Sequence, residues 1–192
     1  MIDIQKEIEK KFPNMDKKEN FLKKSLFKIA KKIVHEDSIN QFLSQNAHLK
    51  GFEFVDAVLD YFDFDYAISS NDLQNIPTSG KVVIIANHPL GGLDALCLLR
   101  LIGQIRKDVK IIANDFLAGF EALNSLIITI DNYKLKQSKS DIKKIYDALK
   151  NEEAVIIFPA GEVSRATPKG IKDPAWNKGF LNFAQNSNAP IL

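Results

Sequence analysis

The sequence of 192 residues has one cysteine, Cys97, and no apolar run that approaches the roughly 20 residues of a membrane-spanning helix. A lone cysteine excludes an intramolecular disulfide, which is typical of a reducing compartment. The N-terminus mixes acidic and basic residues without an apolar segment, so it lacks the pattern of a signal peptide. We therefore expect a cytoplasmic protein whose contact with the inner face of the cell membrane, if any, is peripheral.

The net charge is also small. A value of +2 does not by itself indicate nucleic acid as a partner. The charge is nevertheless uneven, since residues 1–34 contain ten lysines and five acidic residues. Residues 21–34 place apolar side chains on one helical face and lysines around the remainder, which predicts a basic amphipathic helix. Such a helix would either dock on an anionic membrane surface or pack its apolar stripe on the protein, and both interpretations stay open.

Histidine is scarce, with three residues in the chain. His35 and His48 have no partners at the spacing of metal ligands, so we expect them at the surface or at helix ends. The sequence predicts no metal site.

Apolar runs and helical periodicity alternate along the chain, which is the pattern of an α/β protein. The runs predict strands at 65–69, 82–86, 109–113, 126–130 and 154–158, with another beginning at 190. The helical patterns lie at 38–46, 52–62, 94–102, 140–150 and 174–185, while 70–80 indicates a loop and 114–120 a short helix or loop.

This order predicts a largely parallel sheet flanked by helices, whose functional residues gather at the carboxyl ends of the strands. We expect two parts. Residues 1–75 form an N-terminal helical segment that could associate with a membrane, and residues 76–192 form an α/β domain. The chain stops where a strand begins, so we expect that this last domain is truncated.

The most informative stretch is the sequence NHPLGGLD, residues 87–94. It follows a buried strand and precedes a helix, so His88 is expected in a turn at a strand end, one short loop away from Asp94. A carboxylate that holds a neutral imidazole is the usual arrangement of a general base. The alternative is a purely structural turn in which the Asn87 side chain hydrogen-bonds the backbone.

A second motif, FPAGEVSR, occupies residues 158–165 at the end of another predicted strand. Parallel topology should bring it to the same end of the sheet as His88. Together the two motifs resemble those of the glycerolipid (lysophospholipid) acyltransferase family, Asn-His-x4-Asp and Phe-Pro-Glu-Gly-x-Arg-Ser. The likeness is strongest to its hemolysin-like bacterial branch, which is related to ornithine and glycine lipid O-acyltransferases. The resemblance covers residues 76–192 and includes Trp176 to Gly179.

The motifs depart from the usual family pattern in two places. Five residues rather than four separate His88 from Asp94, which Gly91 and Gly92 can absorb in the turn. Ala160 occupies the usual glutamate position, with Glu162 two residues later and the arginine displaced to Arg165. In the family this loop is associated with the acceptor phosphate. The shift argues against lysophosphatidic acid as the acceptor.

The resemblance implies transfer of a fatty acyl group from a thioester to a lipid hydroxyl, in membrane lipid biosynthesis. His88 would be the general base and Asp94 would orient it. The substrates would contact Asn87, Gly161, Glu162, Ser164 and Arg165. We expect Arg165 to bind an anionic group, and Glu162 to hold Arg165 or a polar group of the acceptor. The donor would be acyl carrier protein or coenzyme A carrying the acyl chain, with no further cofactor.

Two other functions stay open. A thioesterase or lipase could use the same His88 and Asp94 to activate water, and a non-catalytic module could bind lipid without turnover. Ser164 is not expected to be a nucleophile, because no Gly-x-Ser-x-Gly motif surrounds it. Cys97 lies among leucines and is expected in the core rather than in catalysis.

Overall fold

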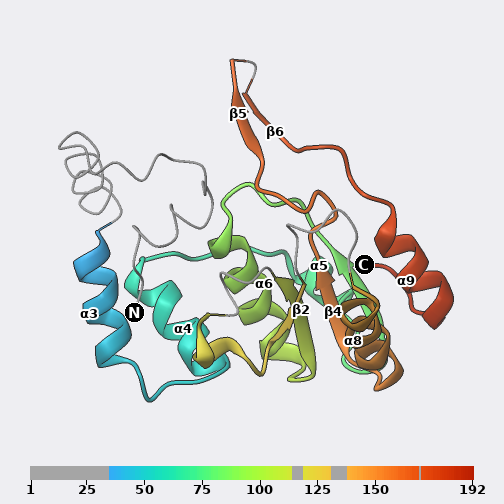
Figure 1. Cartoon of the computed structure of the whole chain (residues 1–192), viewed down its shortest axis with the longest axis horizontal. Helices are drawn as coiled ribbons and strands as arrows, with labels where there is room; N and C mark the ends of the chain where they lie inside the picture. The colour runs from blue at the N-terminus through green and yellow to red at the C-terminus, as the bar shows by residue number, and fades with distance from the viewer. Residues whose placement is uncertain (1–34, 114–118, 131–137, 169) are drawn as a thin grey trace. The chain divides into compact units, whose positions relative to one another are not determined.

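The computed structural model describes residues 35–113, 119–130, 138–168 and 170–192, apart from the side chain of residue 166 (Figure 1). The amphipathic helix predicted at 21–34 lies outside these residues, as does most of the segment at 114–120. The chain divides into two compact units, residues 1–48 and 49–192. The functional division predicted near residue 75 stays a prediction.

The first unit contains helix α3, Glu36–Gln45, which confirms the helix predicted there. His35 precedes it in a left-handed conformation, and the acidic side chains of Glu36 and Asp37 lie in the first turn, where the helix dipole favours them. His35 and His48 are both exposed, as expected.

The second unit is built on a four-stranded parallel sheet in the order β1-β4-β2-β3. The strands are β1 (Val82–Ile85), β2 (Val109–Ala113), β3 (Ile127–Thr129) and β4 (Ala154–Ile157). Beyond β1, where a strand was predicted to begin, Ile191 forms an isolated parallel bridge to Val83. The predicted parallel α/β fold is confirmed.

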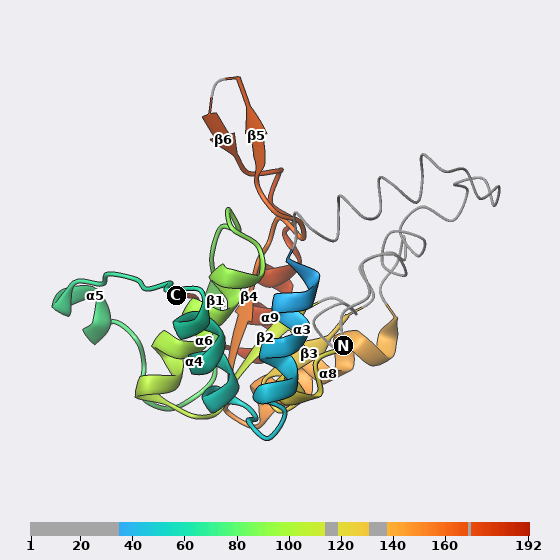
Figure 2. The ribbon, with the colours of Figure 1, turned by 90° about the vertical axis from the view of Figure 1, so that its left-hand side faces the viewer.

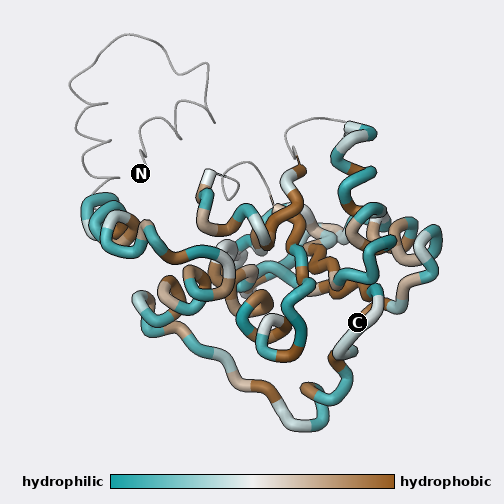
Figure 3. Tube along the Cα trace, turned by 90° about the horizontal axis from the view of Figure 1, so that it is seen from below, coloured by the Kyte–Doolittle hydropathy of each residue, from teal (hydrophilic) through white to brown (hydrophobic). Residues whose placement is uncertain are grey.

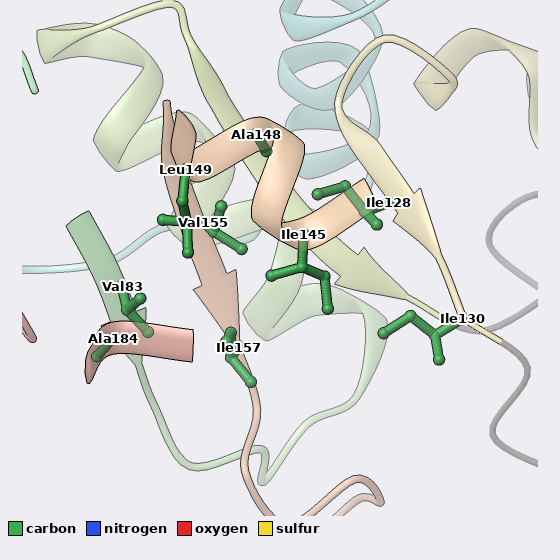
Figure 4. Close-up of a cluster of buried hydrophobic side chains, with 9 residues drawn as sticks. All are labelled: Val83, Ile128, Ile130, Ile145, Ala148, Leu149, Val155, Ile157 and Ala184. Carbon is green, nitrogen blue, oxygen red and sulfur yellow. The ribbon is translucent and has the colours of Figure 1, made fainter. Parts of the chain in front are cut away.

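Helices cover both faces of this sheet, which is why β1 and β4 are apolar at every position. Helices α4 (Phe52–Tyr61) and α6 (Gly92–Ile105) lie on one side, and α8 (Lys139–Lys150) and α9 (Gly179–Ser187) on the other (Figure 2). The hydrophobic stretches of the chain gather in this central region (Figure 3). Alternate strand residues meet α8 and α9 in one core cluster (Figure 4): Val83, Ile128, Ile130, Ile145, Ala148, Leu149, Val155, Ile157 and Ala184.

Three predictions about local structure were wrong. Residues 65–69 form no strand; Ser69 instead caps a short helix, α5 (Ser70–Gln74), by accepting a hydrogen bond from the Asp72 N–H. The loop predicted at 70–80 is therefore helical over its first five residues. The helix predicted from 174 begins only at Gly179, whose N–H donates a hydrogen bond to the Asn177 side chain, and residues 174–177 have no regular secondary structure.

An antiparallel hairpin was not predicted. Strands β5 (Arg165–Thr167) and β6 (Gly170–Lys172) pair only with each other and project from the sheet domain (Figures 1 and 2). They are too short for an alternating pattern to stand out in the sequence. A short helix, η1 (Glu121–Leu123), precedes β3. In the part of the chain that the structure describes, no helix is long and apolar enough to span a membrane.

Candidate active site

His88 lies in the turn that connects β1 to α6, at the carboxyl end of the sheet. The strand ends at Ile85, and α6 begins at Gly92, so Asp94 falls in the first turn of the helix. Gly91 has a φ angle of 72°, a conformation that strongly favours glycine. The turn therefore folds back far enough to bring the helix start beside the histidine.

The two side chains meet as the sequence predicts. His88 Nδ1 lies 3.2 Å from Asp94 Oδ2, although the ring N–H is not aimed at this oxygen well enough for a hydrogen bond. The same oxygen accepts a hydrogen bond of 2.7 Å from the Leu90 N–H, which holds the carboxylate in place. Both side chains are mostly buried, and 17% of the His88 side chain remains exposed. A rotation of the imidazole that aims Nδ1–H at Asp94 Oδ2 would complete a hydrogen bond between the two side chains.

Burial lowers the pKa of His88 below its ordinary value, because the charged imidazolium loses hydration. The negative charges of Asp94 and Asp173 act in the opposite direction and only partly offset this effect. At neutral pH the imidazole is therefore uncharged. That is the form a general base requires.

The second motif lies directly against the first, which confirms the predicted juxtaposition. The Phe158 ring stacks on the His88 ring with centroids 3.9 Å apart and planes 18° apart. The Ser164 N–H donates a hydrogen bond of 2.9 Å to the His88 carbonyl. The imidazole is thus held between its own loop and the loop that follows β4.

The other predicted substrate residues occupy the rim of this region. Glu162 and Arg165 are exposed and form an ion pair in which Arg165 Nη2 donates to both carboxylate oxygens, at 2.8 and 2.9 Å. Asn87 is exposed after β1. Gly161 adopts a φ angle of 68°, and its N–H donates to the Phe158 carbonyl, so this N–H already has a partner. The roles of these residues in substrate binding stay predictions.

Asp173 was missed by sequence reasoning. Its carboxylate accepts a hydrogen bond from the Ser164 hydroxyl, and its charge raises the pKa of His88. Ser164 therefore uses its hydroxyl within the protein. Ser164 and Asp173 flank the β5–β6 hairpin on its two sides. Predicting that Asp173 lies near the His88 loop would have required predicting that hairpin.

Other reactive groups do not add to the site. Cys97 is partly buried in α6, and burial raises the pKa of its thiol, which keeps the sulfur protonated. Among the described ranges, no three His, Cys, Asp or Glu side chains gather closely enough to hold a metal ion. The arrangement that remains is a buried, neutral histidine with an adjacent carboxylate, open on one edge, which is suited to removing a proton from a hydroxyl group.

Comparison with known proteins gives a consistent result. A family profile described as "Acyltransferase" matches residues 8–192. Two curated relatives, from Bacteroides thetaiotaomicron and Phocaeicola vulgatus, are each 32% identical to the chain over 182 and 193 residues, and both are named lyso-glycine lipid O-acyltransferase. The matches cover 94% and 100% of this chain but 65% and 67% of the relatives, so the chain spans about two thirds of their length. No solved structure matches.

Proposed function

Since this chain belongs to the acyltransferase family, we propose that it transfers a fatty acyl group from an acyl thioester to a hydroxyl group of a lipid acceptor. The observation that supports this most directly is the distance of 3.2 Å between His88 and Asp94, at the end of β1 and beside the loop that follows β4. Membership of the family supports the reaction class, and the geometry supports His88 as the base that we propose.

In the proposed reaction, the exposed edge of the His88 ring takes the proton from the acceptor hydroxyl as its oxygen attacks the thioester carbonyl. Asp94 faces Nδ1 and stabilises the imidazolium that forms. The tetrahedral intermediate then collapses, the C–S bond breaks, and the proton passes from His88 to the departing thiolate. Backbone N–H groups in the first turn of α6, other than that of Asp94, which donates to the Gly91 carbonyl, are candidates to stabilise the oxyanion, because a helix begins with donors that have no partner inside the helix.

The acceptor that we propose is a monoacylated amino-acid lipid, as the names of the two relatives suggest. Such a lipid has no phosphate, and an N-acylated amino acid retains its carboxylate. Arg165 could bind this single anionic group if it releases Glu162. A lysophospholipid is the alternative acceptor. The acyl donor would be acyl carrier protein or coenzyme A, and the proposed site of the reaction is the inner face of the cell membrane.

Mass spectrometry can test this directly, with a labelled acyl thioester and a panel of monoacylated amino-acid lipids and lysophospholipids. Both acyl carrier protein and coenzyme A should be tried as carriers. We expect a diacylated product, formed about 10² to 10⁴ times more slowly by His88→Ala, which is the usual contribution of a general base. His48→Ala is the matched control, because His48 is exposed and belongs to neither of the two motifs.

The same experiment separates the alternatives. Free fatty acid as the sole product in the presence of acceptor would identify a hydrolase. A product that forms equally fast in His88→Ala would contradict the assigned base.

A further inference from the structure

The β5–β6 hairpin is a strongly solvent-exposed element of the sheet domain. Arg165, Thr167 and all three residues of β6 are exposed, including Ile171, whose exposed fraction of 70% is the highest among the large apolar residues described. A two-stranded hairpin without a packed face is marginally stable in water. An isoleucine this exposed is costly to leave in water, so the hairpin favours an apolar surface outside the protein.

The base of the hairpin is tied to the candidate active site. The residue before β5, Ser164, donates its N–H to the His88 carbonyl, and its hydroxyl donates to Asp173, the residue after β6. Whatever the hairpin contacts is therefore brought close to the catalytic histidine.

Further apolar side chains are exposed around this base. Leu90 is 53% exposed, although its N–H is bonded to the Asp94 carboxylate. Val163 is exposed beside Gly91. Trp176 is 44% exposed, and the next residue, Asn177, donates its N–H to the Pro159 carbonyl. Isolated exposed apolar residues need no explanation, but these three at the base of a hairpin that carries the exposed Ile171 indicate a contact surface. Tryptophan is common where apolar and aqueous phases meet.

The charge of the same segment indicates which apolar surface it fits. Residues 165–178 contain four basic side chains and one acidic side chain. Asp173 is engaged by Ser164, and no carboxylate of the described residues pairs with Lys172 or Lys178. Lysines beside exposed apolar groups match a bilayer that contains anionic lipid, which attracts each nearby cation.

We propose that the β5–β6 hairpin, with Leu90, Val163 and Trp176 around its base, docks on an anionic lipid bilayer and turns the His88 loop toward it. This inference rests on the proposed function, because it is from the bilayer that a lipid acceptor would reach His88. The hairpin surface is distinct from the amphipathic helix predicted at 21–34, so the two could contribute independently.

Vesicle sedimentation of the full chain tests the proposal. The probes are vesicles of phosphatidylcholine containing phosphatidylglycerol, compared with phosphatidylcholine alone, at low and high salt. Ile171→Asn should weaken binding to the anionic vesicles by about tenfold, the effect of withdrawing one isoleucine from an apolar phase. Ile171→Trp should bind at least as tightly as the wild type. Lys172→Gln should lower binding by roughly fivefold at low salt and less at high salt.

Leu73→Asn is the position control, because Leu73 is an exposed apolar residue on α5, which Figure 2 shows well away from the hairpin. It should bind vesicles like the wild type. Equal binding by Ile171→Asn and the wild type, or no binding by the wild type, would overturn the proposal. The proposal would also be overturned if Ile171→Asn bound vesicles like the wild type but lost turnover only with acyl carrier protein as the donor. That result would assign the hairpin to a protein partner.

Assaying turnover with a short-chain, dispersed acceptor separates this inference from the proposed function. We expect Ile171→Asn to retain activity on the dispersed acceptor while losing activity on vesicles. Vesicle binding that depends on Ile171, in a protein that acylates no acceptor, would overturn the proposed function and support the docking surface.

Discussion

The two ends of the parallel sheet differ in how their polar groups are satisfied. At the amino end, the buried guanidinium of Arg106 forms two hydrogen bonds of 2.7 Å to Asp108. It also donates to the carbonyls of Gly80 and Glu152, at 2.7 and 2.9 Å. One side chain thereby joins the segments that lead into β1, β2 and β4.

The carboxyl end is built in the opposite way. The Nδ1 atom of His88 is buried without an aligned hydrogen bond, and Glu162 and Arg165 pair with each other in solvent. Apolar side chains are exposed around them. At the amino end the polar groups are satisfied by hydrogen bonds that hold the strands in register. At the carboxyl end, the exposed polar and apolar groups are available to bind a ligand. We therefore expect substitutions at the amino end to change stability and those at the carboxyl end to change activity.

The largest expected effect is on activity. Asp94→Asn removes the charge that faces His88, while the amide oxygen can still accept the Leu90 N–H, so the loop should keep its conformation. We expect kcat/KM in the thioester assay to fall by about 10²-fold or more, with little change in Tm. The matched variant at the other end is Asp108→Asn, which removes a charge beside Arg106 and should lower Tm without changing kcat/KM. A loss of Tm in Asp94→Asn and a loss of kcat/KM in Asp108→Asn would contradict the division between an end that provides stability and an end that provides activity.

A smaller effect, on stability, is expected for Arg106→Leu. The guanidinium is almost fully buried, so its loss would leave the carbonyls of Gly80 and Glu152 without a donor. Removing one partner of a buried polar network costs about 3 kcal/mol or more in the free energy of unfolding. Urea denaturation measures this loss. Turnover per folded molecule should stay at the wild-type level, and a variant that is stable but inactive would argue against a purely structural role.

Asp173→Asn should shift the pH dependence by a smaller amount. A base at His88, as we propose, acts as neutral imidazole, so activity should be lost as the pH falls through the pKa of His88, which burial has lowered. Asp173 raises this pKa, and removing its charge lowers the pKa further, so the acid limb of the kcat/KM profile should move to lower pH. Asparagine can still accept the Ser164 hydroxyl.

Ser164→Ala is the control for that shift, since it removes the hydrogen bond and keeps the charge. Its acid limb should not move to lower pH. An unchanged acid limb in Asp173→Asn would show that Asp173 positions the loop without influencing the base.

The sequence predicted the sheet better than the hairpin, for a physical reason. Residues of the buried parallel strands, such as Ile84 and Ile156, belong to runs of β-branched residues. Such runs can be recognised in a short stretch of sequence. The motif at 87–94 is local in the same way, so the approach of Asp94 to His88 could be predicted. Asp173 could not, because its contact depends on two three-residue strands that pair only with each other. Nor could the role of Arg106 in joining the strands, because besides the nearby Asp108 its partners are backbone carbonyls from distant segments.

The smallest effect is expected where the carboxyl end is most exposed. Arg165 pairs with Glu162 three residues earlier, and Lys144 on α8 pairs with Asp141 at the same spacing. Neither Arg165→Gln nor Lys144→Gln should change Tm measurably, because exposed ion pairs contribute little. If Arg165 binds the anionic group of the acceptor, Arg165→Gln should raise KM for that acceptor by at most about fivefold without changing kcat. Lys144→Gln should leave both constants unchanged, and an equal effect of the two variants on KM would mean that Arg165 acts only through the general charge of the surface.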